Sequence, residues 1–145
     1  MRYWDSSALV PCLIRQAATP LCERLLTADR EVVTWWATPI ECASALHRER
    51  RSGRISPDAA TAALDHLERM SDHLVLVEAG RIVRDRALRL LAVHPIISAD
   101  ALQLAAALIW SAERPRGREF VTLDGRLATA AREEGFAVLP AQARS

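Results

Sequence analysis

The chain has 145 residues, a mass of 16.0 kDa, a formal net charge of +1, and 50% hydrophobic and 26% charged residues. This size suits one core, so we expect a single domain over residues 1–145. No apolar stretch approaches the ~20 residues of a membrane-spanning helix, and Asp5 stands where the apolar part of a signal peptide would lie. We therefore expect a soluble, cytoplasmic protein with no membrane partner.

Several chemistries are excluded by residue counts. All 19 basic residues are arginine, and without lysine the chain cannot build a Walker A phosphate loop or a Schiff-base enzyme. The three cysteines form no C-x-x-C pair, and the four histidines show no spacing typical of a zinc site. We therefore expect reduced thiols and no zinc.

Along the chain, short β-branched or aromatic runs alternate with longer alanine- and leucine-rich stretches, a pattern typical of βαβ units. Strands are predicted at 2–5, 31–35, 74–77, 119–122 and 136–139. Helices are predicted at 7–17, 20–28, 38–52, 57–71, 79–92, 99–112 and 125–134. The pattern indicates an α/β sandwich with a mostly parallel sheet.

Four acids fall at the ends of these strands or at the starts of the helices that follow. Asp5 closes the first strand, Asp124 follows the fourth, and Glu41 and Asp100 lie in the first turns of two helices. Because parallel strands end at one edge of a sheet, we expect these four side chains to converge there.

Taken singly, these acids also suit helix capping. Thr38 and Glu41 form a capping-box pattern, Asp124 is a candidate N-cap, and Asp100 is favoured by the helix dipole. Asp5 fits capping less well, because Ser6 or Ser7 could cap the next helix. Together, four neighbouring carboxylates repel one another unless they take up protons or a cation, and all-oxygen ligands favour Mg²⁺ or Mn²⁺.

Four motifs in this order carry a resemblance to a known family. They are YWDSSALV at 3–10, PIECASAL at 39–46 followed by GRIS at 53–56, ISADALQLAAA at 97–107, and FVTLDGRLA at 120–128. On these motifs the chain resembles PIN-domain proteins along nearly its whole length, and specifically the toxins of VapBC-type toxin–antitoxin pairs.

The resemblance implies a three-layer α/β/α sandwich with a five-stranded sheet in the order 3-2-1-4-5. It further implies a Mg²⁺-dependent endoribonuclease, with Mn²⁺ as a substitute, that hydrolyses single-stranded or looped RNA. Expected targets are tRNA or rRNA, whose cleavage into 5′-phosphate and 3′-hydroxyl ends inhibits translation and growth. By the same resemblance, Asp5, Asp100 and Asp124 bind metal, Glu41 holds or deprotonates metal-bound water, and Ser6 and Thr122 support the site.

The resemblance also implies a homodimer and a cognate antitoxin that forms a heteromer with the toxin and covers its groove. Apolar residues on the helices predicted at 7–17 and 57–71 are expected to be core. Arginines cluster at several places along the sequence. If RNA is the substrate, the clusters at 48–54 and 114–118 are candidates for contacts to its phosphates. Trp35 and Trp36 are both expected to be buried.

Two alternatives stay open on sequence grounds. One is a non-catalytic PIN-like protein-binding module whose acids serve as caps or hold a structural metal. The other is a metal-dependent DNA nuclease or phosphatase, since the same carboxylates suit that chemistry and no motif reveals recognition of the 2′-hydroxyl.

Overall fold

A parallel sheet organises residues 1–141, the part of the chain that this computed structural model describes. Its five strands are β1 (Arg2–Trp4), β2 (Val32–Trp35), β3 (Val75–Val77), β4 (Glu119–Val121) and β5 (Ala137–Leu139). They lie in the order β3-β2-β1-β4-β5, and every neighbouring pair is parallel. The predicted parallel sheet and its strand order are both confirmed.

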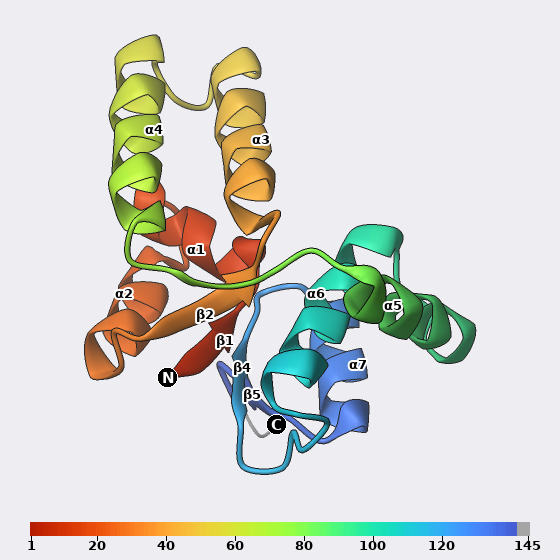
Figure 1. Cartoon of the computed structure of the whole chain (residues 1–145). Helices are drawn as coiled ribbons and strands as arrows, with labels where there is room; N and C mark the ends of the chain where they lie inside the picture. The colour runs from red at the N-terminus through yellow and green to blue at the C-terminus, as the bar shows by residue number, and fades with distance from the viewer. Residues whose placement is uncertain (142–145) are drawn as a thin grey trace.

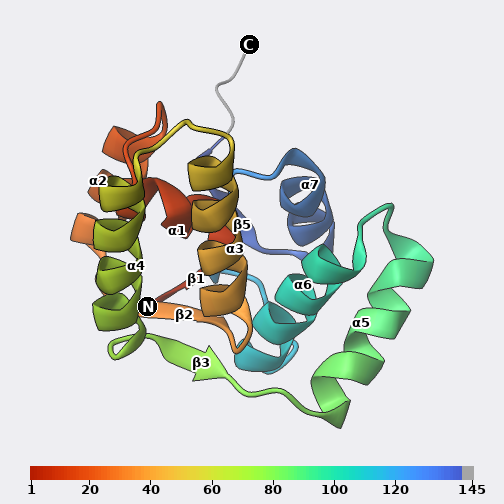
Figure 2. The ribbon, with the colours of Figure 1, turned by 90° about the horizontal axis from the view of Figure 1, so that it is seen from above.

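Helices cover both faces of this sheet (Figures 1 and 2). One layer contains α1 (Ser6–Leu13), α2 (Thr19–Ala28), α3 (Thr38–Arg51) and α4 (Pro57–Ser71). The other contains α5 (Arg81–Val93), α6 (Ser98–Trp110) and α7 (Gly125–Glu134). The three-layer α/β/α sandwich is thus confirmed.

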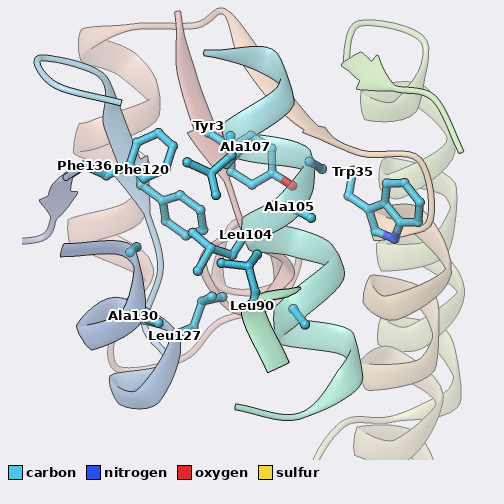
Figure 3. Close-up of a cluster of buried hydrophobic side chains, with 14 of the residues drawn as sticks. Tyr3, Trp35, Leu90, Leu104, Ala105, Ala107, Phe120, Leu127, Ala130 and Phe136 are labelled. Carbon is cyan, nitrogen blue, oxygen red and sulfur yellow. The ribbon is translucent and has the colours of Figure 1, made fainter. Parts of the chain in front are cut away.

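Successive side chains along each strand point to opposite faces of the sheet, so a hydrophobic core forms on each face. Tyr3 packs in the core under α5, α6 and α7, beside Phe120 of β4, with ring centroids 5.0 Å apart (Figure 3). Trp4, the next residue along β1, points to the opposite core with Val32 and Val121. Because β1 is central, both of these aromatic side chains are fully buried.

Most apolar residues on α1 and α4 are buried or half-buried, and most of these belong to the second core, as the sequence predicts. Leu9, Ala60 and Leu67 are buried, and Leu13 and Leu64 pack against that cluster. Among residues 1–141, no single helix is long and apolar enough to cross a membrane, although α5 and α6 together pass that test as a pair bent by 119°.

The end of α1 differs from the prediction, which extends this helix to residue 17. It stops at Leu13, and Ile14 is extended, with φ −132° and ψ 150°. The hydroxyl of Thr19 donates to the Pro11 carbonyl at 2.7 Å and accepts from the Gln16 amide at 2.8 Å. These two bonds replace helical ones and fold the segment between α1 and α2.

Candidate active site

The four acids singled out in the sequence line one groove at the carboxyl edge of the sheet. The groove has a volume of about 680 Å³, and its walls include Asp5, Glu41, Asp100 and Asp124. Asp5 directly follows β1, Asp124 precedes α7, and Glu41 and Asp100 lie in the first turns of α3 and α6. The fold therefore brings together residues separated by up to 119 positions in the sequence, the span from Asp5 to Asp124.

Asp5 is the most buried of the four, with 4% of its surface exposed. Its Oδ2 atom accepts hydrogen bonds from the Thr122 hydroxyl at 2.9 Å, from the Ser7 amide at 3.2 Å and from the Ser7 hydroxyl. Burial raises the pKa of Asp5, while the bonds from Ser7 and Thr122 oppose that rise. These donors hold the carboxylate in one orientation.

Asp5 is also the N-cap of α1, because it accepts the Ser7 amide two residues ahead. The expectation that Ser6 or Ser7 would provide this cap is therefore wrong. The two serine hydroxyls bond to carboxylates instead: Ser7 to Asp5, and Ser6 to Glu41 at 2.8 Å. The same aspartate thus serves helix capping and the groove.

Glu41 has one carboxylate oxygen anchored within the protein. Its Oε2 atom accepts from the Ser6 hydroxyl at 2.8 Å and from the Gln103 side-chain amide at 3.1 Å. Burial is the main cause that raises the pKa of Glu41, and the nearby charge of Asp5 adds to it. No hydrogen bond within residues 1–141 reaches the other oxygen, Oε1, which leaves it available to a ligand in the groove.

The predicted capping box at the start of α3 is wrong. Ala37 is the N-cap residue, and no side chain caps this end. The Thr38 hydroxyl instead accepts from the Thr34 hydroxyl at 2.7 Å and from the Gln103 amide at 2.9 Å. Since tertiary contacts engage Thr38, Glu41 has no capping role.

Gln103 is a site residue that the sequence reasoning missed. It is 1% exposed and accepts a hydrogen bond from the Tyr3 hydroxyl at 2.7 Å through Oε1. That bond fixes the orientation of the amide, so that Nε2 points to Thr38 and Glu41. The available signal was a lone polar residue in an apolar helical run, three positions after Asp100 and therefore on the same helix face.

Asp124 and Asp100 also line the groove. Asp124 caps α7 as predicted, accepting the Leu127 amide at 2.9 Å through Oδ1, and its own amide donates to the Thr122 hydroxyl at 3.1 Å. Burial, followed by the charges of Asp124, Asp5 and Glu41, raises the pKa of Asp100 to about 6. Asp100 therefore interacts electrostatically with all three of the other carboxylates.

The raised pKa of Asp100 predicts a specific dependence of stability on pH. The folded, metal-free protein favours the protonated form of Asp100, because ionisation places a charge in a half-buried site beside three other acids. The contribution of Asp100 to the free energy of unfolding is therefore highest below the unfolded pKa of about 3.9, and it falls as the pH rises through about 6 and Asp100 ionises. After discounting for solvent screening of this half-buried group, Asp100→Asn should raise the free energy of unfolding by about 1 kcal/mol near neutral pH.

Thermal unfolding of metal-free protein measures this effect. The variant should melt about 3 °C above the wild type near neutral pH, and the difference should vanish below about pH 4. Added Mn²⁺ should stabilise the wild type more than the variant. Equal melting temperatures at both pH values would contradict the electrostatic coupling among the four acids.

The donor set of the groove fits a hard divalent cation. Around the four acids it offers carboxylate and hydroxyl oxygens, and the Oδ2 atom of Asp124, like Oε1 of Glu41, has no hydrogen-bond partner within the described residues. However, no three His, Cys, Asp or Glu side chains of residues 1–141 form a ready-made metal site. Mg²⁺ does not need a complete set of protein ligands, because it retains several waters and commonly uses only one or two carboxylates together with substrate phosphates.

An aromatic side chain lies exposed at the same edge of the sheet. Trp35, the last residue of β2, is buried as expected, but Trp36 is 47% exposed, so the expectation that it would be buried is wrong. The two rings meet edge to face, with centroids 6.5 Å apart. Since β2 ends at Trp35, the next side chain has no neighbouring strand to pack against.

Known proteins resemble this chain in structure rather than in sequence. No family model and no curated protein sequence matches it. The structure of PAE2754 from Pyrobaculum aerophilum superposes with a TM-score of 0.65 at 20% identity, covering 95% of this chain and 89% of that one. FitAcB from Neisseria gonorrhoeae superposes with a TM-score of 0.67 at 15% identity, covering 95% and 96%.

The fold is PIN-like. The similarity to both structures extends over nearly the whole of each chain, and the sheet order and helical layers are those that the motifs predict. At these identities the likeness concerns the fold alone. Within the PIN-like fold, the acid-lined groove lies where open parallel sheets hold their ligands, outside the carboxyl ends of the strands.

Proposed function

We propose that the chain is a metal-dependent endoribonuclease that hydrolyses phosphodiester bonds in single-stranded or looped RNA. The observation that supports this function is the convergence of Asp5, Glu41, Asp100 and Asp124 on one groove of a PIN-like fold. Mg²⁺ is the proposed cofactor, with Mn²⁺ as a substitute. A carboxylate cluster by itself repels the phosphates of RNA, and a bound divalent cation would offset that repulsion.

In this proposal Asp5, Asp100 and Asp124 hold the cation. When bound, the cation would supply Lewis-acid stabilisation of the phosphate charge and would acidify a water molecule. Glu41 is placed to orient the attacking water through Oε1, because Ser6 and Gln103 hold its other oxygen. The raised pKa of Glu41 also suits a group that accepts a proton from water.

The proposed reaction is hydrolysis with a defined outcome. The water oxygen forms a bond to phosphorus, and the bond from phosphorus to the 3′ oxygen breaks. One water proton passes to the protein, and the departing oxygen takes up a proton to become a 3′-hydroxyl. The products therefore carry 5′-phosphate and 3′-hydroxyl ends.

We further propose that this nuclease is the toxin of a toxin–antitoxin pair that acts in the cytoplasm as a homodimer. Support comes from the VapBC-type motifs and from the fold shared with FitAcB. A cognate antitoxin that covers the groove would keep the acids from tRNA or rRNA. The exposed Ile40 and Ile97 side chains in the groove walls offer apolar contacts for such a partner.

One observation favours the alternative of a protein-binding module. Asp5 and Asp124 both cap helices, so two of the four acids have a structural role that needs no metal. This role accounts for neither Glu41 nor Asp100, whose carboxylates cap no helix within the described residues. The nuclease therefore explains more of the site.

Expression without a partner protein tests the proposed function in a cell. The wild-type chain should arrest growth of a bacterial host, and the Asp100→Asn chain, expressed to the same level, should not. In parallel, the purified protein should cut cellular RNA in preference to single-stranded DNA or a phosphomonoester. Harmless wild-type expression would count against the toxin, and cleavage of DNA alone would replace the ribonuclease by the DNA nuclease.

A further inference from the structure

The groove that holds the four acids extends along α3 to a residue of opposite charge. Its walls there include Ser44 and Arg48 of α3 and Gln16 from the segment after α1. Arg48 is the only cationic side chain among the described residues that line the groove. The groove is therefore acidic around Glu41 and basic farther along the same helix.

The helix geometry places Arg48 on the groove side of α3. Glu41, Ser44, Ala45 and Arg48 are spaced at i, i+3, i+4 and i+7, which puts them on one helix face. The rise along the helix separates the backbones of Glu41 and Arg48 by about 10 Å. Because helical side chains lean towards the N-terminus, the arginine leans back towards the acids.

Arg48 also differs from the other arginines of its cluster. Arg54 is held by Glu49 through two hydrogen bonds, at 2.7 and 3.0 Å. Arg50 and Arg51 are exposed but do not line the groove. Arg48 is exposed and forms no ion pair with any carboxylate of residues 1–141. Of the four arginines between 48 and 54, it alone combines a free guanidinium with a place in the groove.

We propose that Arg48 binds a phosphate of the RNA strand that flanks the phosphate held at the four acids. This inference rests on the proposed ribonuclease function and names a substrate-binding residue for it. The planar guanidinium matches two phosphate oxygens, and such a contact positions a strand without reading its bases. Because the acids lie at one part of the groove and the single positive charge at another, the RNA strand is positioned along the groove between them.

The salt dependence of RNA binding tests this contact, because each phosphate contact on a single strand adds about 0.7 to the slope of log K against log salt. The probe is a fluorescent pool of single-stranded RNA of randomised sequence, bound to full-length Asp100→Asn protein so that no cleavage occurs. Arg48→Gln added to this protein should lower the slope by about 0.7 and weaken binding several-fold. Arg51→Gln, the matched control from the same helix, should change neither. Arg48→Lys should restore the slope because it restores the charge.

The same variants in the otherwise wild-type chain give a second readout. Arg48→Gln should reduce kcat/KM for cleavage of total cellular RNA several-fold, and Arg51→Gln should leave it unchanged. An unchanged slope in Arg48→Gln, or equal losses in the two variants, would overturn the role of Arg48 while leaving the nuclease in place. A parent protein that neither binds nor cuts RNA would overturn the proposed function and, with it, this contact.

Discussion

Asp100→Asn is expected to lower the rate of RNA cleavage by at least about 10³-fold, since a catalytic metal contributes several kcal/mol of stabilisation to the transition state. Asp100 is the acid with a pKa raised to about 6 by burial and by all three neighbouring carboxylates, so it lies where the negative charge is concentrated. The amide has nearly the same shape as the carboxylate but carries no charge. Initial rates on total cellular RNA with Mn²⁺ measure the effect.

Asp58→Asn is the matched control for this substitution. Asp58 also lies in the first turn of a helix, α4, but it is exposed and does not line the groove. It should retain the wild-type rate. Equal rates in the wild type and both variants would remove Asp100 from the site, and an equal loss in both would indicate a general effect of removing an acid from a helix start.

Removal of divalent metal should abolish cleavage, to the same extent as Asp100→Asn or more. The groove presents several carboxylates, and no arginine of residues 1–141 forms an ion pair with the four acids, so a bound phosphate would meet uncompensated negative charge. Treatment with EDTA followed by dialysis should leave no detectable cutting. Mg²⁺ or Mn²⁺ should restore it.

The metal-free protein must remain folded for that result to count. Its far-ultraviolet circular dichroism and its melting curve supply the check, because the groove carboxylates are held by protein donors such as Thr122, Ser7 and Gln103 without a cation. Activity that persists in chelator, in a folded protein, would contradict metal-dependent catalysis.

The fold could be predicted from sequence because its signals are local. Each strand is a short β-branched or aromatic run, and each helix has a periodic apolar face, so all twelve predicted elements are found, although α1 ends four residues earlier than predicted. Gly135 ends α7 in a left-handed conformation, with φ 107°, which only glycine adopts without strain. The parallel sheet follows from the same pattern, whereas the order of the strands within it came from the family resemblance.

The hydrogen bonds that orient Thr38 and Glu41 could not be predicted in this way, because they depend on Gln103, which lies 65 and 62 positions away on another helix. Thr38 fits a capping box on local pattern, yet Thr34 and Gln103 occupy its hydroxyl. Gln103 acts on Glu41 from another helix, 62 positions away. A capping rule weighs only neighbours within one turn and has no information about such partners.

The acids themselves show how capping and site formation coincide. A residue at the carboxyl end of a strand, just before the next helix, is placed both to cap that helix and to face the edge of the sheet. Asp5 and Asp124 do both. The sequence patterns that argue for a cap at these two positions therefore carry no evidence against a site.

The most direct test of the four-acid site is the mapping of RNA ends. Purified chain, free of any partner, is incubated with total cellular RNA and Mn²⁺ beside Asp100→Asn prepared identically, and new 5′-phosphate ends are sequenced. We expect discrete cuts with 5′-phosphate and 3′-hydroxyl ends in the wild-type reaction and none in the variant. The same cuts in both reactions, or none in either, would contradict a nuclease centred on Asp5, Glu41, Asp100 and Asp124.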